Sequence, residues 1–323
     1  MEEQTLIKAD LQFAKEVKKG LTDFPKHLSS KFIYDENGDK IFQEIMEMPS
    51  YYLTNCEYET LQRNRRQIVE LFTKNSNSIN LIELGAGDGK KTKLLLEELY
   101  NRNTNFKYTP IDISQNALDL LHSSLIKEYP NIEVAPFQGT YIESLKRIGN
   151  TGDEKNIILF LGSNIGNLLH EQAILFLQEL EKTMKDEDMI FLGCDQKKDP
   201  QTILDAYNDP EGLTEAFNKN ILARINTELE GNFDLDKFKH WEVYDPQTGT
   251  AKSYLVSLEP QDVAIKMLDL ELSFAQWETI HTEISQKYDD LTINELADKA
   301  GLKIVMAYAD DKNYFKNYIL VKK

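Results

Sequence analysis

The sequence predicts an α/β fold built on a mostly parallel sheet, and three observations indicate it. Between residues 79 and 194, short apolar runs alternate with helical patterns, as in consecutive βαβ units. The runs are apolar throughout, as in Ile157-Ile-Leu-Phe-Leu161, which is typical of strands that are covered on both faces. The first run leads directly into a glycine-rich turn, at the edge where open α/β sheets bind their ligands.

The segment before the first strand is mainly helical. Apolar periodicity predicts helices at 10–21, 40–48 and 55–74. A short extended piece is expected at 31–34, before the turn Asp35-Glu-Asn-Gly38. Pro49-Ser-Tyr-Tyr-Leu-Thr54 then interrupts the helical pattern with two adjacent tyrosines. Tyrosines beside a proline fit a packed loop as well as a binding segment.

The sheet itself follows in order along the chain. Strands are expected at 79–85, 106–114, 131–140, 156–163 and 187–194. After Asp195 the alternation stops, and helical patterns lie around 202–208 and 213–229. Alternating stretches then predict a small antiparallel sheet from 241–244, 251–258 and 262–268. The final runs, 302–308 and 318–323, predict an antiparallel hairpin that closes the main sheet.

Composition limits the possible functions. The chain has 323 residues and a net charge of -17, from 54 acids and 37 Lys and Arg, so nucleic acid is a disfavoured partner. Cys56 and Cys194 have no metal or redox spacing, and the five histidines are scattered, so no metal site is expected. No membrane-length apolar run and no basic signal-peptide start occur. A cytoplasmic protein that does not bind membranes is expected.

The glycine-rich turn, Gly85-Ala86-Gly87-Asp88-Gly89, follows the acid Glu83. A dinucleotide fingerprint needs a third glycine at position 90, and Lys90 stands there. An acid followed by G-x-G-x-G is instead the signature of class I S-adenosylmethionine (SAM) methyltransferases, in which turn and acid meet the amino-acid half of the cofactor. Asp112, at the end of the next strand, is expected to hold the ribose. Alone, the turn also fits an ordinary tight loop.

A second polar loop follows the fourth strand. Leu161-Gly-Ser-Asn-Ile-Gly-Asn-Leu168 places Ser163, Asn164 and Asn167 at the rim that faces the cofactor. A turn in which an asparagine caps the next helix explains the same residues.

Near the end of the chain, Glu283 and Ser285 lie two residues apart and share one side if 281–287 is extended. Such a pair can hold a group that both donates and accepts hydrogen bonds, such as an imidazole. It also fits a solvated strand face.

With these motifs combined, the chain resembles the L-histidine Nα-methyltransferase family. Its members use SAM to trimethylate histidine to hercynine in ergothioneine biosynthesis, and a related fungal group methylates a prenylated tryptophan. The resemblance covers nearly the whole chain. It rests on 31–35, 49–54, 82–87, 161–168, 206–209, 216–220, 232–236 and 282–285.

The resemblance implies a Rossmann-like class I methyltransferase fold with a second, substrate-binding lobe made from the N-terminus and an insertion. The SAM-binding domain would comprise 60–196 and 287–323, and the substrate-binding domain 1–59 and 197–286. Both crossings between the domains lie near the cofactor turn, so the second domain could present a small amino-acid substrate to the methyl group. A monomer is expected.

The resemblance also implies the site residues. Those that hold the amino and carboxylate groups of the amino acid are Tyr51, Asn167 and Tyr207, with Tyr51 and Asn167 as the catalytic pair. Those around the imidazole are Tyr34, Glu283 and Ser285. Those expected at the cofactor are Glu83, Gly85, Gly87, Lys90, Asp112, Thr140, Tyr141 and Gly162.

Two departures from the family pattern keep other readings open. Gly139-Thr-Tyr141 stands where bacterial members tend to carry Asp-Phe. Thr140 can still accept a hydrogen bond from the adenine amino group, but with a neutral hydroxyl in place of a charged carboxylate. A position that often carries methionine falls near Ser253 or Tyr254. The alternative substrate is tryptophan or another aromatic amino-acid derivative, and the alternative of another class is a non-catalytic SAM-binding interaction module. Glu283 and Ser285 favour histidine.

Overall fold

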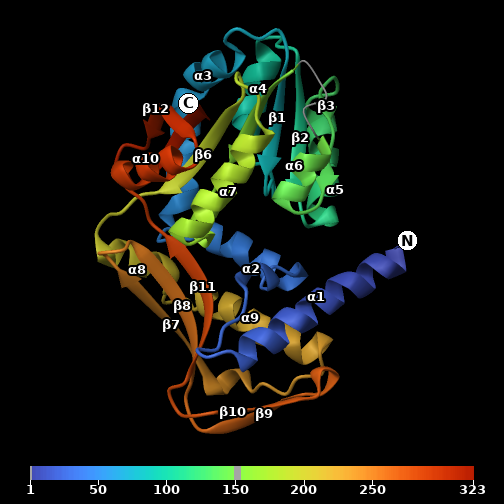
Figure 1. The fold of residues 1–323 in the computed structure, drawn as a ribbon, viewed down its shortest axis with the longest axis vertical. Helices are drawn as coiled ribbons and strands as arrows, with labels where there is room; N and C mark the ends of the chain where they lie inside the picture. The colour runs from blue at the N-terminus through green and yellow to red at the C-terminus, as the bar shows by residue number, and fades with distance from the viewer. Residues whose placement is uncertain (1, 149–153) are drawn as a thin grey trace. The chain divides into compact units, whose positions relative to one another are not determined.

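The computed structural model describes residues 2–148 and 154–323, and the chain divides into two compact units (Figure 1). Unit 1 comprises Met1–Tyr52 and Lys198–Ser285. Unit 2 comprises Leu53–Lys197 and Gln286–Lys323. Each unit is therefore assembled from two separate stretches of chain. The assignment of substrate to one unit and cofactor to the other stays a prediction.

A mixed sheet forms the centre of unit 2. Its strands are β1 (Ile79–Leu84), β2 (Phe106–Asp112), β3 (Glu133–Val134), β4 (Phe137–Gln138), β5 (Lys155–Phe160), β6 (Met189–Asp195), β12 (Leu302–Ala309) and β13 (Phe315–Lys322). Their order is β12-β13-β6-β5-β1-β2-β3, with β4 also beside β2. β1 to β6 pair in parallel, whereas β13 is antiparallel to both β6 and β12. The predicted α/β fold class and its antiparallel closing hairpin are confirmed.

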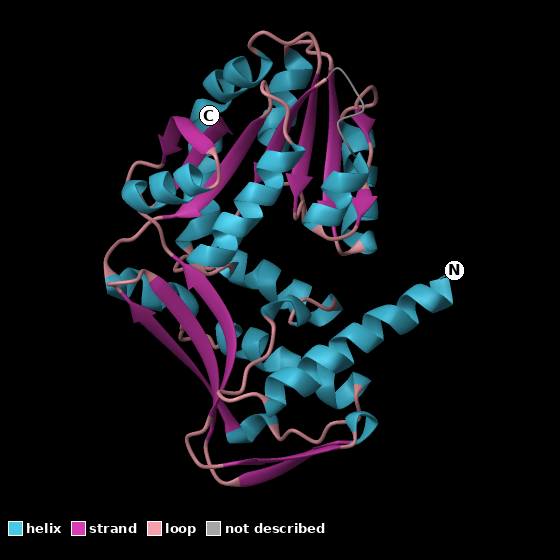
Figure 2. Ribbon diagram, in the orientation of Figure 1, coloured by secondary structure: helices cyan, strands magenta, loops and turns pink. Residues whose placement is uncertain are grey.

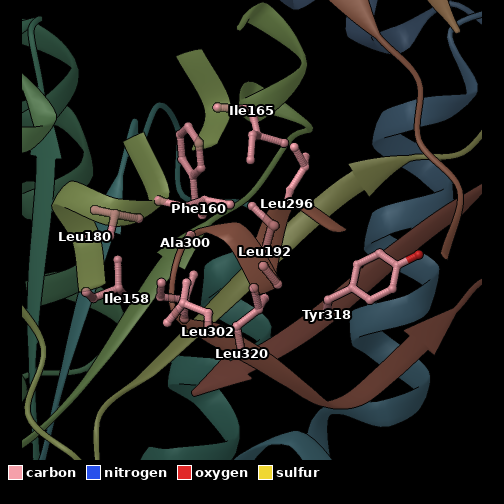
Figure 3. Close-up of a cluster of buried hydrophobic side chains, with 14 of the residues drawn as sticks. Ile158, Phe160, Ile165, Leu180, Leu192, Leu296, Ala300, Leu302, Tyr318 and Leu320 are labelled. Carbon is pink, nitrogen blue, oxygen red and sulfur yellow. The ribbon is translucent and has the colours of Figure 1, made fainter. Parts of the chain in front are cut away.

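Helices cover both faces of this sheet. They are α3 (Tyr52–Thr73), α4 (Thr92–Asn101), α5 (Gln115–Glu128), α6 (Tyr141–Ile148), α7 (His170–Thr183) and α10 (Asp290–Lys299). α3, α4 and α5 pack with Leu81 and Leu159 in one buried cluster, and α6, α7 and α10 pack with Ile82 and Phe160 in another. Figure 3 shows part of the second cluster. Successive strand residues thus face opposite apolar layers, which explains their continuous apolar runs.

One predicted strand of this sheet is divided. The run expected at 131–140 forms two short strands, β3 and β4, and both pair with β2. Ala135 and Pro136 separate them, and the Ala135 amide still donates to the Tyr108 carbonyl. Proline has no amide hydrogen for the ladder, so the strand cannot continue through position 136.

Unit 1 combines helices with short antiparallel pairings. Its helices are α1 (Glu2–Thr22), α2 (Glu36–Glu47), α8 (Pro200–Tyr207) and α9 (Leu213–Glu228), with 3₁₀ turns η1 (Ser30–Phe32), η3 (Leu235–Lys237) and η4 (Lys266–Leu268). Its strands are β7 (Phe238–Asp245), β8 (Thr250–Ser257), β9 (Gln261–Ile265), β10 (Leu270–Phe274) and β11 (Thr279–Gln286). Figure 2 shows the sheet β11-β8-β7 as three adjacent strands, against which α8 and α9 pack.

Two predictions for unit 1 are wrong. The third strand of the small sheet is β11, not the run expected at 262–268, because β9 pairs with β10 instead. Asp269 has a left-handed φ of 46°, and this reverses the chain between these two strands. The piece expected to be extended at 31–34 overlaps η1, where the Ile33 amide donates to the Ser30 carbonyl. This segment therefore forms its backbone hydrogen bond within a local turn and not with a neighbouring strand.

Candidate active site

The glycine turn after β1 exposes its backbone. Gly85, Gly87 and Gly89 all have positive φ, of 76°, 51° and 65°, which glycine adopts without strain. Among the described residues, no atom lies within 4 Å of the place where a Cβ on Gly87 would stand. The turn therefore presents main-chain groups to open space, and a ligand can approach them closely.

Asp112 lies beside this turn because β2 pairs with β1 in parallel. The amide of Gly87 donates to Asp112 Oδ2 at 3.1 Å, and the amide of Ser114 donates to Oδ1 at 3.0 Å. A carboxylate has about four acceptor positions, so two amides leave capacity for further donors such as ribose hydroxyls. The acid predicted to hold a ribose is thus fixed next to the open turn.

Glu83 is placed differently from Asp112. Its side chain is buried, and it accepts hydrogen bonds from Thr92 Oγ1 at 2.5 Å and from the Tyr108 hydroxyl. These partners lie on α4 and β2, so the carboxyl group ties the start of that helix to the sheet. With two hydroxyl donors bound and only 3% of the residue exposed, Glu83 offers less open surface to a cofactor than Asp112.

The environment of Glu83 predicts a pH effect on stability. Burial raises its pKa from 4.5 to about 7, although hydrogen bonds from Thr92 and Tyr108 lower it. A carboxyl group with a higher pKa in the folded chain stabilises the fold only while it is protonated. Its contribution is fully present below 4.5 and is lost as the pH rises through about 7.

The Glu83→Gln variant should lack this dependence. Melting temperatures of wild type and variant, measured across this pH range, should therefore shift in favour of the variant as the pH rises. A difference that stays constant with pH would contradict the elevated pKa.

A buried acid that the sequence did not reveal connects the turn to the second polar loop. Glu57, on α3, is 0% exposed. Its Oε2 accepts from Lys91 Nζ at 2.6 Å and from the Gly162 amide at 2.8 Å, and its Oε1 accepts from Asn317 Nδ2 at 2.8 Å. A Cβ on Gly193 would lie 2.3 Å from Oε1, so only glycine leaves room for this carboxylate. One side chain thus fixes Lys91 and Gly162 together.

Lys91, which follows the predicted Lys90 in the chain, lies beside this loop. The Lys91 side chain is 22% exposed and its ammonium pairs with Glu57, whereas Lys90 is exposed. A Cβ on Gly162 would lie 3.3 Å from Lys91 Nζ. The two lysines are adjacent in sequence, and only the contact with α3 distinguishes them.

Further predicted residues surround Gly85. A Cβ on Gly85 would lie 2.8 Å from the Tyr141 hydroxyl and 3.2 Å from Asn164 Nδ2. Burial, with a smaller effect of Asp112, raises the pKa of Tyr141 to about 12, so its hydroxyl stays protonated near neutral pH. Thr140 Oγ1 donates to Glu143 Oε2 at 2.7 Å at the start of α6. Tyr141 is thus part of the group around the turn, while Thr140 takes part in a local helix contact.

In unit 1, aromatic rings form a continuous group around three predicted tyrosines. Tyr34 lies 5.4 Å from Phe42 and 5.2 Å from Phe217 between ring centroids. Phe42 lies 6.2 Å from Tyr51, which in turn lies 6.1 Å from Tyr207. All four of these pairs are edge-to-face, which suits the ring quadrupoles. Phe42 and Phe217 were not predicted, because nothing in their spacing sets them apart from core residues.

The polar end of this group lies on β11. The hydroxyls of Tyr207 and Ser285 are 2.9 Å apart. Glu283 and Ser285 belong to the same strand two residues apart, which confirms that this segment is extended and that they share a side. Ser253, near which the family often carries methionine, is buried and donates to Glu242 Oε2 at 2.7 Å.

The two sets of predicted residues are thus divided between the units. Unit 2 brings together Gly85, Gly87, Asp112, Tyr141 and Gly162, whereas unit 1 contains Tyr34, Tyr51, Tyr207, Glu283 and Ser285. Asn167, assigned to the amino acid by resemblance, is an exposed residue of unit 2 at the end of the 3₁₀ turn η2 (Asn164–Asn167).

Within residues 2–148 and 154–323, no three His, Cys, Asp or Glu side chains are placed to hold a metal ion. Nor does any helix there have the length and apolar character needed to span a membrane.

Nearly the whole chain is similar in sequence to known proteins. A family model described as histidine-specific, SAM-dependent methyltransferase matches residues 13–322. The histidine N-alpha-methyltransferase of Mycolicibacterium smegmatis is 34% identical over 302 residues, which are 93% of this chain and 92% of that protein. The protein of the same name from Mycobacterium tuberculosis is 32% identical, over 94% and 93%. Ergothioneine biosynthesis protein 1 of Schizosaccharomyces pombe is 27% identical over 91% of this chain and 39% of its own length.

Proposed function

The chain belongs to the family of histidine-specific, SAM-dependent methyltransferases, and we propose that it methylates the α-amino group of L-histidine. The product would be the trimethylated betaine hercynine, the intermediate that leads to ergothioneine. The family match over nearly the whole chain carries this proposal, because it includes both units and not the cofactor turn alone. A non-catalytic SAM-binding module would not need a polar and aromatic group of the kind found in unit 1.

The residues around the turn fit SAM. The carboxylate of Asp112 suits the ribose, and the open backbone at Gly87, together with Lys91 and the Gly162 loop, suits the amino-acid half. Lys91 is held by Glu57 through one contact, and an ammonium has three donors, so it can also donate to a carboxylate. When bound, SAM supplies a methyl group that is already activated on a sulfonium.

The proposed role of Lys91 predicts different effects for the two adjacent lysines. Lys91→Met should raise the dissociation constant for S-adenosylhomocysteine, by roughly tenfold if a hydrogen bond to a charged group is lost. Lys90→Met is the matched control, because that side chain is exposed, and it should bind normally. Calorimetric titration of both variants measures this. The reverse order of effects would restore Lys90 as the contact.

The amino acid would be held mainly by unit 1. By resemblance, Tyr51, Asn167 and Tyr207 hold its amino and carboxylate groups. An imidazole needs one acceptor and one donor, and in this scheme Glu283 accepts from its N–H while Ser285 donates to its other nitrogen. The Tyr207 hydroxyl, 2.9 Å from Ser285, would donate to it and so orient its proton.

For methyl transfer, the side chains mainly need to position the α-amino group. An α-ammonium group has no lone pair, so it must lose a proton before it can accept a methyl group. Removing the amine from water among aromatic rings favours its neutral form, so no strong base is needed. Tyr51 and Asn167 would orient the lone pair. The proton would leave to water, either directly or through the Tyr51 hydroxyl, which passes its own proton to water as it accepts one. Aromatic rings also attract the methylated ammonium groups through cation–π interaction.

Ligand binding tests this scheme directly. In the presence of S-adenosylhomocysteine, L-histidine should bind more tightly than histamine, which lacks the carboxylate, and than imidazolepropionate, which lacks the amine. L-Tryptophan is the informative competitor. Tighter binding of tryptophan than of histidine would contradict the proposed specificity and leave the fold and cofactor unaffected.

We also propose that the enzyme acts as a cytoplasmic monomer on small molecules and not on nucleic acid. The net charge of -17 opposes binding to phosphate backbones. Cys56 and Cys194 are buried and form no disulfide, which suits a reducing compartment.

A further inference from the structure

His240 is buried next to the proposed substrate contacts, and neither the proposed mechanism nor the family resemblance assigns it a role. It lies on β7 and its side chain is 4% exposed. Its Nε2 is 2.9 Å from the backbone carbonyl of Tyr207. Its Nδ1 is buried and has no hydrogen-bond partner among the described residues. Among the described residues, the imidazole therefore forms one hydrogen bond, and its partner is the backbone of Tyr207, a residue predicted to contact the substrate.

The hydrogen bond defines the state of the ring. A carbonyl oxygen can only accept, so the hydrogen must be on Nε2. Burial lowers the pKa of His240, and this outweighs the opposing effects of the Tyr207 carbonyl, Glu215 and Asp209, while Lys219 also lowers it. The ring is therefore neutral near pH 7, with hydrogen on Nε2 and a lone pair on Nδ1.

The position of the carbonyl gives this bond its effect. Tyr207 is the last residue of α8, and the final carbonyls of a helix have no partner within the helix. His240 donates to this carbonyl from the neighbouring strand and so attaches the end of α8 to β7. The same residue, Tyr207, extends its hydroxyl to Ser285 on β11. One residue is therefore held at its backbone by β7 and at its side-chain tip by β11.

We infer that His240 is a positioning residue for amino-acid binding, which fixes the Tyr207 side chain by donating its Nε2 hydrogen to the Tyr207 carbonyl. It does not touch the amino acid itself. The inference rests on the proposed role of Tyr207 as a substrate contact. It concerns only the amino acid, because all the residues involved belong to unit 1 and the proposed nucleoside contacts belong to unit 2.

A matched pair of variants tests the inference. The amide nitrogen of glutamine can reach the place of Nε2, whereas the shorter asparagine places its amide nearer Nδ1. His240→Gln should therefore keep the KM for histidine close to that of wild type. His240→Asn should raise it by roughly tenfold, as for the loss of one hydrogen bond to a buried group. The KM for SAM at saturating histidine should be unchanged in both.

A double-mutant cycle with Tyr207→Phe separates positioning from general loss of structure. If His240 acts through Tyr207, the effects of His240→Asn and Tyr207→Phe on the KM for histidine should be less than additive. Additive effects, equal KM values for the Gln and Asn variants, or a parallel rise in the KM for SAM would overturn the inference. Wild-type turnover of histidine is measured first, and its absence would count against the proposed function instead.

Discussion

Replacing Glu283 with alanine should raise the KM for L-histidine strongly and leave the KM for SAM unchanged. Glu283 shares one side of β11 with Ser285, which contacts Tyr207. Its carboxylate is proposed to accept from the imidazole N–H. A hydrogen bond to a charged group contributes about 1.5–3 kcal/mol, so kcat/KM for histidine should fall by roughly 10- to 150-fold.

Two further variants make this result specific. Glu283→Gln keeps an acceptor oxygen but removes the charge, so its loss should be smaller than that of the alanine variant. Glu271→Ala, on the exposed side of β10, is the control for removing one negative charge from unit 1 and should behave as wild type. Unchanged histidine kinetics in Glu283→Ala would remove Glu283 from the substrate site.

Replacing Asp112 with alanine should weaken SAM binding. Asp112 is fixed beside the turn by the amides of Gly87 and Ser114, and it is the acid proposed to accept the ribose hydroxyls. Loss of an acceptor that faces two hydroxyls should cost about 1–3 kcal/mol, which is roughly 5- to 150-fold in the dissociation constant. Calorimetric titration with S-adenosylhomocysteine measures it.

The control for this variant is Asp119→Ala, because Asp119 is an exposed acid on α5 that pairs with Gln115. It should bind the cofactor normally. A wild-type affinity in Asp112→Ala would argue against a ribose contact.

The sequence predicted most of the sheet because local pattern and burial agree there. Parallel strands that are covered on both faces require continuous apolar runs, and such runs in the sequence predicted β1, β5 and β6. Pro136 also marks the place where the strand expected at 131–140 is interrupted, although the sequence pattern predicts one continuous strand there. The pairing of β9 was not, because the choice between β8 and β10 depends on a turn at Asp269 rather than on the strand's own alternation.

Local motifs predicted part of the proposed site, and the family resemblance supplied the rest. The turn at 85–89 and Asp112 follow from spacing along consecutive strands. The contact between Glu57 and Gly162 joins residues 105 positions apart, and that between His240 and Tyr207 joins a side chain to a backbone carbonyl. Neither leaves a local signature. The ion pair of Lys91 has the same origin, because its partner Glu57 is contributed by α3.

The most direct test is mass spectrometry of the purified protein incubated with SAM and an equimolar mixture of the twenty amino acids. The proposed function predicts that histidine alone gains mass, that the gain reaches three methyl groups, and that fragmentation places all of them on the α-nitrogen. Methylation of tryptophan or of a histidine ring nitrogen would contradict the proposed substrate and orientation. The absence of any methylated amino acid would contradict the proposed catalysis altogether.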